Sequence, residues 1–149
     1  MKNYDRALPI ALLRAREATL RPFRKELEQI GLTVQQWRVI RALAEGAPLS
    51  ASALSERCVL MPPSLSRILR NLSERGLIER VEDSDARRRT MRITEAGRAR
   101  YDAMAGRAAA IYQRMERAFG KEKMETLLDL LCELREVAEK EDFEAGPMG

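Results

Sequence analysis

The stretch "SASALSERCVLMPPSLSRILRNLSERG", residues 50–76, has the pattern of two short helices joined by a tight turn. Ser50 suits the start of the first helix because its hydroxyl can accept a backbone N–H there. The prolines at 62–63 are tolerated in the first turn of the second helix, and Gly76 suits its end. The apolar positions of that helix recur at helical spacing: Leu65, Ile68, Leu69 and Leu72. The stretch therefore predicts a helix-turn-helix.

A hairpin is predicted directly after this helix. The strips "LIERV" (77–81) and "TMRIT" (90–94) show the apolar alternation of short strands. A two-stranded hairpin in this place is a wing, so the fold class is mainly α, a winged helix-turn-helix. The hairpin tip carries three adjacent arginines, Arg87, Arg88 and Arg89, which repel one another unless they meet negative charge.

The tip suits the minor groove of DNA, which is negative and more so where it is narrow. Asp83 and Asp85 can hold the arginines through charge-assisted hydrogen bonds. The alternative is a solvated loop whose local ion pairs contribute little.

The second helix has a polar face that suits DNA recognition. Opposite its apolar residues lie Pro63, Ser64, Ser66, Arg67, Arg70 and Asn71. The N-terminal part of such a helix meets base edges, so Ser64, Ser66 and Arg67 are candidates for base contacts. Arg70 is placed for phosphate or base, while Ser50 and Ser52 can meet phosphate. The alternatives are exposed polar side chains and, for Ser64, a simple helix cap.

Amphipathic helices flank this centre. They are predicted at about 6–30, where Pro22 should kink or break the helix, at 33–46 with a capping box of Thr33 and Gln36, at 95–118 and at 121–141. The terminal helices have more apolar face than a small winged domain can cover, so a second copy of the chain should cover it; folding back on the same chain is the alternative. We therefore expect a homodimer, with dimerisation helices at 1–32 and 98–149 and a DNA-binding lobe at 33–97.

Charge and composition agree with a polyanion partner. The chain has 149 residues and a net charge of +4, but residues 57–100 alone hold eleven Arg against six acidic residues. Residues 120–149 are acidic. No apolar run is long enough to span a bilayer, and the N-terminus lacks the features of a signal peptide, so we expect a cytoplasmic protein with no membrane partner.

Catalytic and metal chemistry find no support in the sequence. The chain has no His, and its two cysteines, Cys58 and Cys132, are far apart with no CxxC. A zinc site is thereby disfavoured. Ser-His and Cys-His catalysis are excluded for a single chain. We expect no enzyme, no metal and no cofactor.

The run "DARRRTMRITEAG", residues 85–97, resembles the wing signature of the MarR-type winged helix-turn-helix regulators, and "SLSRILRNLSERGLIER", residues 64–80, resembles their recognition helix and first wing strand. The resemblance extends over about residues 8–140. The segments "IALLRAREA", "LTVQQWRVIRALAE" and "CVLMPPSLSRIL" are similar to the homoprotocatechuate-operon repressor branch, which controls the degradation of aromatic acids.

This resemblance implies a homodimeric transcriptional regulator whose two wings flank a pseudo-palindromic operator, with half-sites ~10 bp apart. It also implies that Asp85 orients Arg87 and that Arg87 is the minor-groove residue. Arg88 and Arg89 match looser basic positions and are expected to contact phosphate.

Many members of the family hold a small-molecule pocket where the dimer helices meet the lobe, so the resemblance suggests a repressor released by a small aromatic acid. An anionic ligand needs a cation in an apolar cleft, and Arg16 lies on the apolar stripe of the first helix. Trp37 and Arg41 can add a stacking wall and a second cation. The alternatives are an Arg16 that snorkels or pairs with a carboxylate, and a Trp37 in the core.

Two other functions stay open at this point. Some members of the family sense peroxide through cysteine, which would make Cys58 a redox switch, although those place the thiol near the start of the first helix. The second open function is a dimeric adaptor that binds another protein through its acidic last helix.

Overall fold

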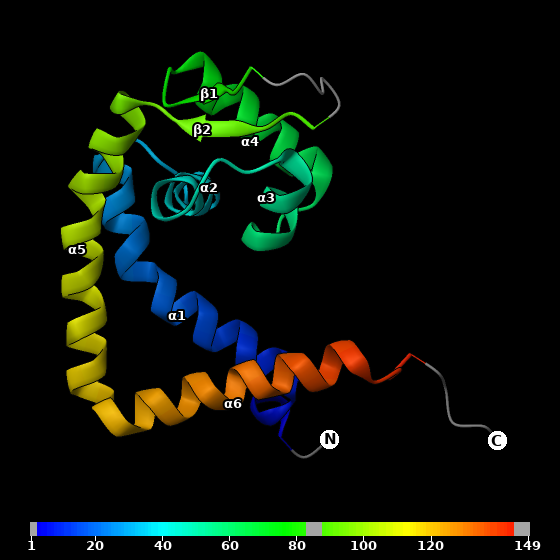
Figure 1. Ribbon diagram of the computed structural model, residues 1–149. Coiled ribbons are helices and arrows are strands. Elements are labelled where there is room, and N and C mark those ends of the chain that lie inside the picture. The colour runs from blue at the N-terminus through cyan, green and yellow to red at the C-terminus, as the bar shows by residue number, and fades with distance from the viewer. Residues whose placement is uncertain (1–2, 83–87, 145–149) are drawn as a thin grey trace. The chain divides into compact units, whose positions relative to one another are not determined.

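The computed structural model describes residues 3–82 and 88–144, and it confirms a mainly helical winged helix-turn-helix (Figure 1). The chain forms two compact units that divide after Ala108. The first contains η1 (Tyr4–Arg6), α1 (Leu8–Gln29), α2 (Val34–Glu45), α3 (Ala51–Cys58), α4 (Pro62–Glu74), β1 (Ile78–Arg80), β2 (Met91–Ile93) and the first part of α5 (Glu95–Phe119). The second contains the rest of α5 and α6 (Lys121–Lys140).

The helix limits follow local chemistry. At α2 the predicted capping box is present: Gln36 N–H donates to Thr33 Oγ1 at 3.1 Å, and Thr33 N–H donates to Gln36 Oε1 at 3.0 Å. Ser50 caps α3 by accepting from Ala53 N–H at 3.2 Å. Beyond α4, Gly76 has a φ of +71°, a left-handed conformation that glycine adopts without strain.

Pro22 does not break the first helix. Of the kink or break predicted there, the break is wrong, since α1 runs without interruption from Leu8 to Gln29. A proline inside a helix removes one backbone hydrogen bond. Phe23 and Leu27, which follow it, are both buried. Their burial anchors the helix beyond the proline, so that tertiary packing offsets the local cost.

The wing is a two-stranded antiparallel sheet. Ile78 pairs with Ile93 and Arg80 with Met91. The alternation predicted for 77–81 fails at its start, because Leu77 and Ile78 are both buried. Leu77 precedes β1: its N–H donates to Leu72 O at 3.0 Å, in the turn that ends α4. Its orientation is therefore set by the turn and not by the pleat.

The core of the first unit joins α1, α2, α3, α4, the wing and the first part of α5. Its buried apolar side chains are Phe23, Leu27, Leu32, Trp37, Val39, Ile40, Leu43, Leu54, Cys58, Leu65, Leu69, Leu72, Leu77, Ile78, Met91, Met104 and Ala108. Trp37 stacks on Tyr101 of α5, with ring centroids 5.5 Å apart and planes 14° from parallel. Trp37 thus lies in the core, which was the alternative in the sequence interpretation.

The wing and α5 meet at a close backbone approach. Thr94 Oγ1 donates to Gly76 O at 2.6 Å and accepts from Gly97 N–H at 3.1 Å. A Cβ added to Gly97 would lie 2.0 Å from Leu77 O, so only glycine fits there. The Thr-x-x-Gly of the sequence signature therefore fixes the base of the wing against the end of α4.

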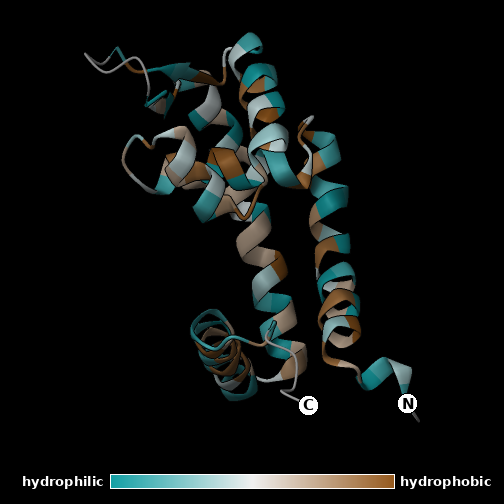
Figure 2. Ribbon diagram, turned by 90° about the vertical axis from the view of Figure 1, so that its right-hand side faces the viewer, coloured by the Kyte–Doolittle hydropathy of each residue, from teal (hydrophilic) through white to brown (hydrophobic). Residues whose placement is uncertain are grey.

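The second unit differs because α6 buries no side chain. Six large hydrophobic residues of α6 are exposed: Leu127, Leu128, Leu130, Leu131, Leu134 and Val137. In the first unit, hydrophobic residues also recur along α1 toward its N-terminal end (Figure 2), where Leu8, Leu12 and Leu13 are exposed. Over residues 3–82 and 88–144, no helix is both long and apolar enough to cross a membrane.

Candidate nucleic-acid interface

The recognition helix α4 is divided into a buried face and a polar face. Leu65, Leu69 and Leu72 are at most 8% exposed, which fixes the helix against the core. On the other side Pro63, Arg67 and Arg70 are exposed, whereas Ser64 and Ser66 are half-buried. The N-cap residue of α4 is Met61, so Ser64 does not cap the helix. The polar side chains predicted from the sequence are therefore held on a rigid support.

A shallow hollow lies between α4 and the start of α2. It is lined by Thr33, Gln35, Gln36, Ser64, Arg67, Ile68 and Asn71. Within it Gln36 Nε2 donates to Asn71 Oδ1 at 3.1 Å. The sequence interpretation placed Asn71 on the polar face without a role and assigned Gln36 only to the capping box. No sequence signal links two residues that lie 35 positions apart.

The start of α3 forms a second hollow together with the wing. Ser50, Ser52, Arg88 and Thr90 are among the residues that line it, and its volume is about 710 Å³. Ser50 uses a lone pair to cap α3, and its O–H remains a donor. An N-terminal helix end, hydroxyl groups and an arginine all favour an anion, so this hollow has the chemistry of a phosphate contact.

The base of the wing is hydrogen-bonded to the segment before α3. Leu49 N–H donates to Met91 O at 3.1 Å, and Met91 N–H donates to Leu49 O at 2.9 Å. Ala51 N–H also donates to Arg88 O at 3.4 Å. Leu49 is a single apolar residue, which is too short a signal for a strand in the sequence. These backbone hydrogen bonds hold the wing in a fixed position beside the start of α3.

Arg88 and Arg89 are exposed on this wing. Arg89 has a φ of 47°, in the left-handed region that side chains other than glycine seldom adopt. Arg92 Nε pairs with Glu79 at 2.7 Å across the ladder. The predicted roles of Asp83, Asp85 and Arg87 lie outside the described residues.

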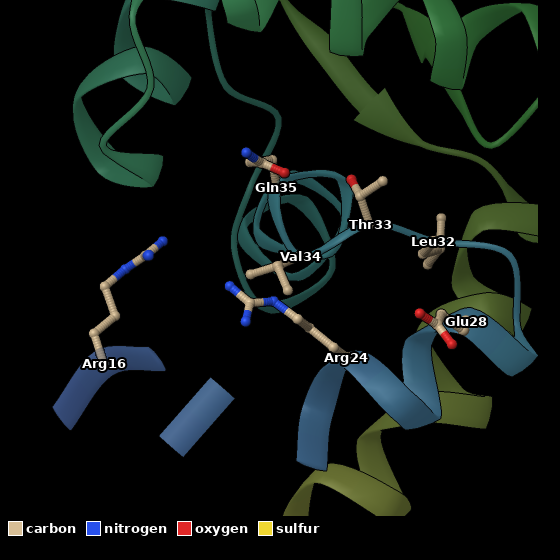
Figure 3. Close-up of a pocket in the computed structure, with 7 residues that line it drawn as sticks. All are labelled: Arg16, Arg24, Glu28, Leu32, Thr33, Val34 and Gln35. Atoms are coloured by element: carbon tan, nitrogen blue, oxygen red, sulfur yellow. The ribbon is translucent and has the colours of Figure 1, made fainter. Parts of the chain in front are cut away.

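Of the three predicted ligand residues, Arg16 borders a hollow between α1 and α2 that the other two do not line. Arg16 opens onto a hollow of about 320 Å³, lined also by Arg24, Glu28, Leu32, Thr33, Val34 and Gln35. Figure 3 shows Arg16 and Arg24 extending from α1 toward the first turn of α2. Trp37 and Arg41 are not among the residues that line it. Trp37 packs on Tyr101, and Arg41 Nε pairs with Glu45 at 2.6 Å.

Arg24 is a cation of this hollow that sequence reasoning missed. Its guanidinium donates twice to Glu17, at 2.9 and 3.2 Å, and Arg16 donates to the same carboxylate at 3.2 Å. The hydrogen bond from Arg24 lowers the pKa of Glu17, and Glu17 in turn raises the pKa of Arg24. Arg16 therefore does pair with a carboxylate, as one alternative held, yet it borders a cavity at the same time.

Cys58 is buried beside Arg38. Arg38 Nη1 donates to Cys58 O at 2.7 Å, and Cys58 Sγ donates to Arg38 O at 3.6 Å. Burial raises the pKa of the Cys58 thiol and lowers the pKa of Arg38. A buried thiol with a raised pKa is a poor nucleophile, so the geometry favours a structural cysteine. The described residues include no cluster of three or more His, Cys, Asp or Glu side chains able to hold a metal ion.

A helix with a buried inner face and a cationic outer face, joined to a hairpin with exposed arginines, defines the winged helix-turn-helix DNA-binding proteins. Comparison with known proteins gives the family. Residues 30–89 match the model described as "MarR family". The HTH-type transcriptional regulator FarR of Neisseria gonorrhoeae is 37% identical over 132 residues, which are 88% of this chain and 90% of that protein. The chain belongs to the MarR family of transcriptional regulators.

Two further comparisons bear on its role. The homoprotocatechuate degradative operon repressor of Escherichia coli is 37% identical over 128 residues, 85% of this chain and 86% of that protein. The crystal structure of NadR in complex with 4-hydroxyphenylacetate aligns with a TM-score of 0.81 at 35% identity, over 89% of this chain and 98% of NadR. The family predicted from the sequence is thus confirmed.

Proposed function

We propose that this regulator is a homodimeric repressor that releases its operator when a small aromatic acid binds. The observation that carries the DNA-binding part is the division of α4, whose apolar face is buried and whose arginines are exposed. The name of the Escherichia coli relative supports repression, and the NadR complex supports an aromatic acid as the ligand. In this proposal residues 33–97 form the DNA-binding lobe, while 1–32 and 98–149 serve dimerisation.

On DNA, α4 enters the major groove and the wing reaches the neighbouring minor groove. Arg67 is the candidate for a bidentate contact with guanine O6 and N7. Ser50, Ser52 and Arg88 contact phosphates, since they line one hollow beside the start of α3. Ser64, Ser66 and Arg70 extend the contact along α4, and Arg89 lies on the wing beside Arg88. By the family resemblance Arg87, oriented by Asp85, is the proposed minor-groove contact; both residues lie outside the described ranges.

Dimerisation rests on apolar surface that the chain leaves exposed. Leu127, Leu131 and Leu134 of α6 lie on one side of the helix at spacings of four and three, and each is at least 36% exposed. Fully burying a leucine contributes about 1.5–3 kcal/mol. Because these side chains are only 36–39% exposed, a second copy that covers this face would recover roughly 0.5–1 kcal/mol for each residue, which supports a twofold dimer.

The effector site rests on the hollow between α1 and α2. Two arginines border it, and Leu32 and Val34 supply apolar lining, a combination that suits a carboxylate attached to a ring. A ligand that binds more tightly when the two DNA-binding lobes have a spacing unsuited to the operator lowers operator affinity, by no more than its difference in affinity for the two spacings.

The test combines DNA binding with calorimetry. A duplex selected by the protein from a randomised pool should be retarded in a gel, and its affinity should fall steeply as salt rises, because counterions are released. Titration with 4-hydroxyphenylacetate should release heat and weaken retardation, while the neutral 4-hydroxyphenylacetamide, a matched control, should do neither. Arg16→Ala should abolish the acid's effect and leave operator binding intact.

Separate results would overturn separate parts of the proposal. Absence of heat from the acid, with unchanged retardation, would remove the effector. Failure to select any duplex would remove DNA binding and favour the adaptor with an acidic α6. The redox alternative gains nothing from the structure, because Cys58 is buried and bonded to α2 through Arg38.

A further inference from the structure

Gln36 makes three hydrogen bonds at the start of α2, and one of them reaches the recognition helix. Its backbone N–H donates to Thr33 Oγ1 at 3.1 Å, and its Oε1 accepts from Thr33 N–H at 3.0 Å. Its Nε2 donates to Asn71 Oδ1 at 3.1 Å. One side chain thus caps α2 and contacts α4 at the same time.

These bonds determine which way both amides face. A backbone N–H can only donate, so the oxygen of Gln36 must face Thr33 and its nitrogen must face Asn71. Asn71 then accepts through Oδ1. The two N–H donors of an asparagine lie on the other side of the amide from its oxygen, so Asn71 presents them away from α2.

Asn71 is exposed on the DNA-facing side of α4. It follows Arg67 by four residues, as Arg67 follows Ser64 by three, and all three line the same hollow. It is also near the C-terminal end of α4, which runs from Pro62 to Glu74. The N-terminal residues of a recognition helix meet base edges. A donor this far along the helix is placed for a phosphate oxygen.

We propose that Asn71 donates a hydrogen bond to a DNA phosphate and that Gln36 is the positioning residue that turns its amide toward it. This inference rests on the proposed DNA-binding function. It also explains the choice of side chain at position 36. A capping box is completed by either Glu or Gln, but only Gln also carries an N–H donor for Asn71.

Gln36→Glu separates the two roles of this residue. The carboxylate still accepts from Thr33 N–H, so α2 keeps its cap and the thermal midpoint should stay close to that of the wild type. The same carboxylate cannot donate to Asn71. The Asn71 amide should therefore turn over, which points Oδ1 at the phosphate and removes the donor.

The experiment is a double-mutant cycle on the duplex selected by the wild-type protein. Asn71→Ala should weaken binding about three- to tenfold, the range of one hydrogen bond, on specific and nonspecific duplexes alike. The salt dependence of affinity should not change, because asparagine carries no charge. Gln36→Glu should weaken binding at least as much, with unchanged thermal stability.

Charge repulsion is removed within the cycle. The negative charge of Gln36→Glu repels DNA whether or not Asn71 is present. The loss of affinity due to repulsion therefore remains in the Asn71→Ala background, whereas the loss due to a misplaced Asn71 amide disappears. Gln35→Glu, which adds the same charge one residue earlier, is the matched control and should show no coupling to Asn71. Gln36→Ala removes the donor without adding charge and repeats the cycle if Gln36→Glu proves unstable.

Each result decides the inference. Coupling between positions 36 and 71, without coupling between 35 and 71, supports it. Wild-type affinity for Asn71→Ala, or fully additive effects in both cycles, overturns it while leaving the proposed function intact. Failure of the wild-type protein to bind any selected duplex would instead overturn both.

Discussion

The DNA-binding lobe and α6 use the same kind of apolar pattern with opposite results. In α4 the leucines at 65, 69 and 72 are almost completely buried. In α6 the leucines at 127, 131 and 134 recur at equivalent spacing and stay exposed. Helical periodicity therefore indicates which face needs a partner, but not whether the partner lies in the same chain. For α4 the partners are α2, α3 and the wing; for α6 we propose a second copy.

The largest expected effect tests this difference directly. Leu131→Glu combined with Leu134→Glu should convert a dimer into a monomer, since a twofold dimer loses the covering of four leucines, roughly 0.5–1 kcal/mol each, and would have to bury four carboxylates in their place. Sedimentation at micromolar concentration measures the outcome. Glu136→Lys, on the opposite face of α6 by helical geometry, is the control and should remain dimeric. A wild-type protein that sediments as a monomer would contradict the proposed dimer.

The next effect probes the lobe from within. Gly97→Ala should destabilise the fold by roughly 3 kcal/mol, because the new Cβ would overlap Leu77 O and force the wing away from α5. Gly106→Ala in the same helix is the control: nothing lies within 4 Å of its Cβ. That change should be neutral or stabilise by about 0.5–1 kcal/mol. Urea denaturation measures both, and equal effects would refute the close approach.

A smaller effect distinguishes the helix from the wing. Arg67→Ala should relax discrimination at one base position by ~1–3 kcal/mol, whereas Arg88→Ala should weaken binding to all sequences and reduce the salt dependence by about one counterion. Competition binding with single-base variants of the selected duplex measures both changes. Uniform loss for Arg67→Ala would restrict that residue to phosphate contact.

The smallest effect concerns the two thiols. Burial raises the pKa of Cys58, so at pH 7 less of it is thiolate than an unperturbed thiol would have, and its rate of alkylation should rise only as the pH is increased. Cys132 is exposed and serves as the internal reference. Iodoacetamide followed by mass spectrometry should show labelling of Cys132 well before Cys58. Selective, fast labelling of Cys58 at neutral pH would restore the redox alternative.

Local signals predicted most of the fold. Ser50, the prolines of α4, Gly76 and the Thr33–Gln36 capping box each act within a few residues, and each marks the helix end that the structure shows. Pro22 was the exception. Its local preference for a break is outweighed by burial of Phe23 and Leu27, which depends on distant parts of the chain.

The candidate site was predictable only in its individual side chains. Helical spacing placed Arg67 and Arg70 on the exposed face of α4, because that face depends on residues within the same helix. It could not reveal that Gln36 bonds to Asn71 or that Arg24 shares a hollow with Arg16. Those contacts depend on how α1 and α4 pack against α2, which periodicity along one helix does not specify.

The pairing of Leu49 with Met91 has a consequence for protein engineering. Chimaeras between family members are naturally designed by exchanging the hairpin, residues 78–93, as if it were a separate module. Here one of its strands also pairs with a residue that precedes α3, and Arg88 O accepts from Ala51 N–H. A transplanted hairpin must therefore bring its matching segment around residues 48–51, or its backbone will lose partners at the junction.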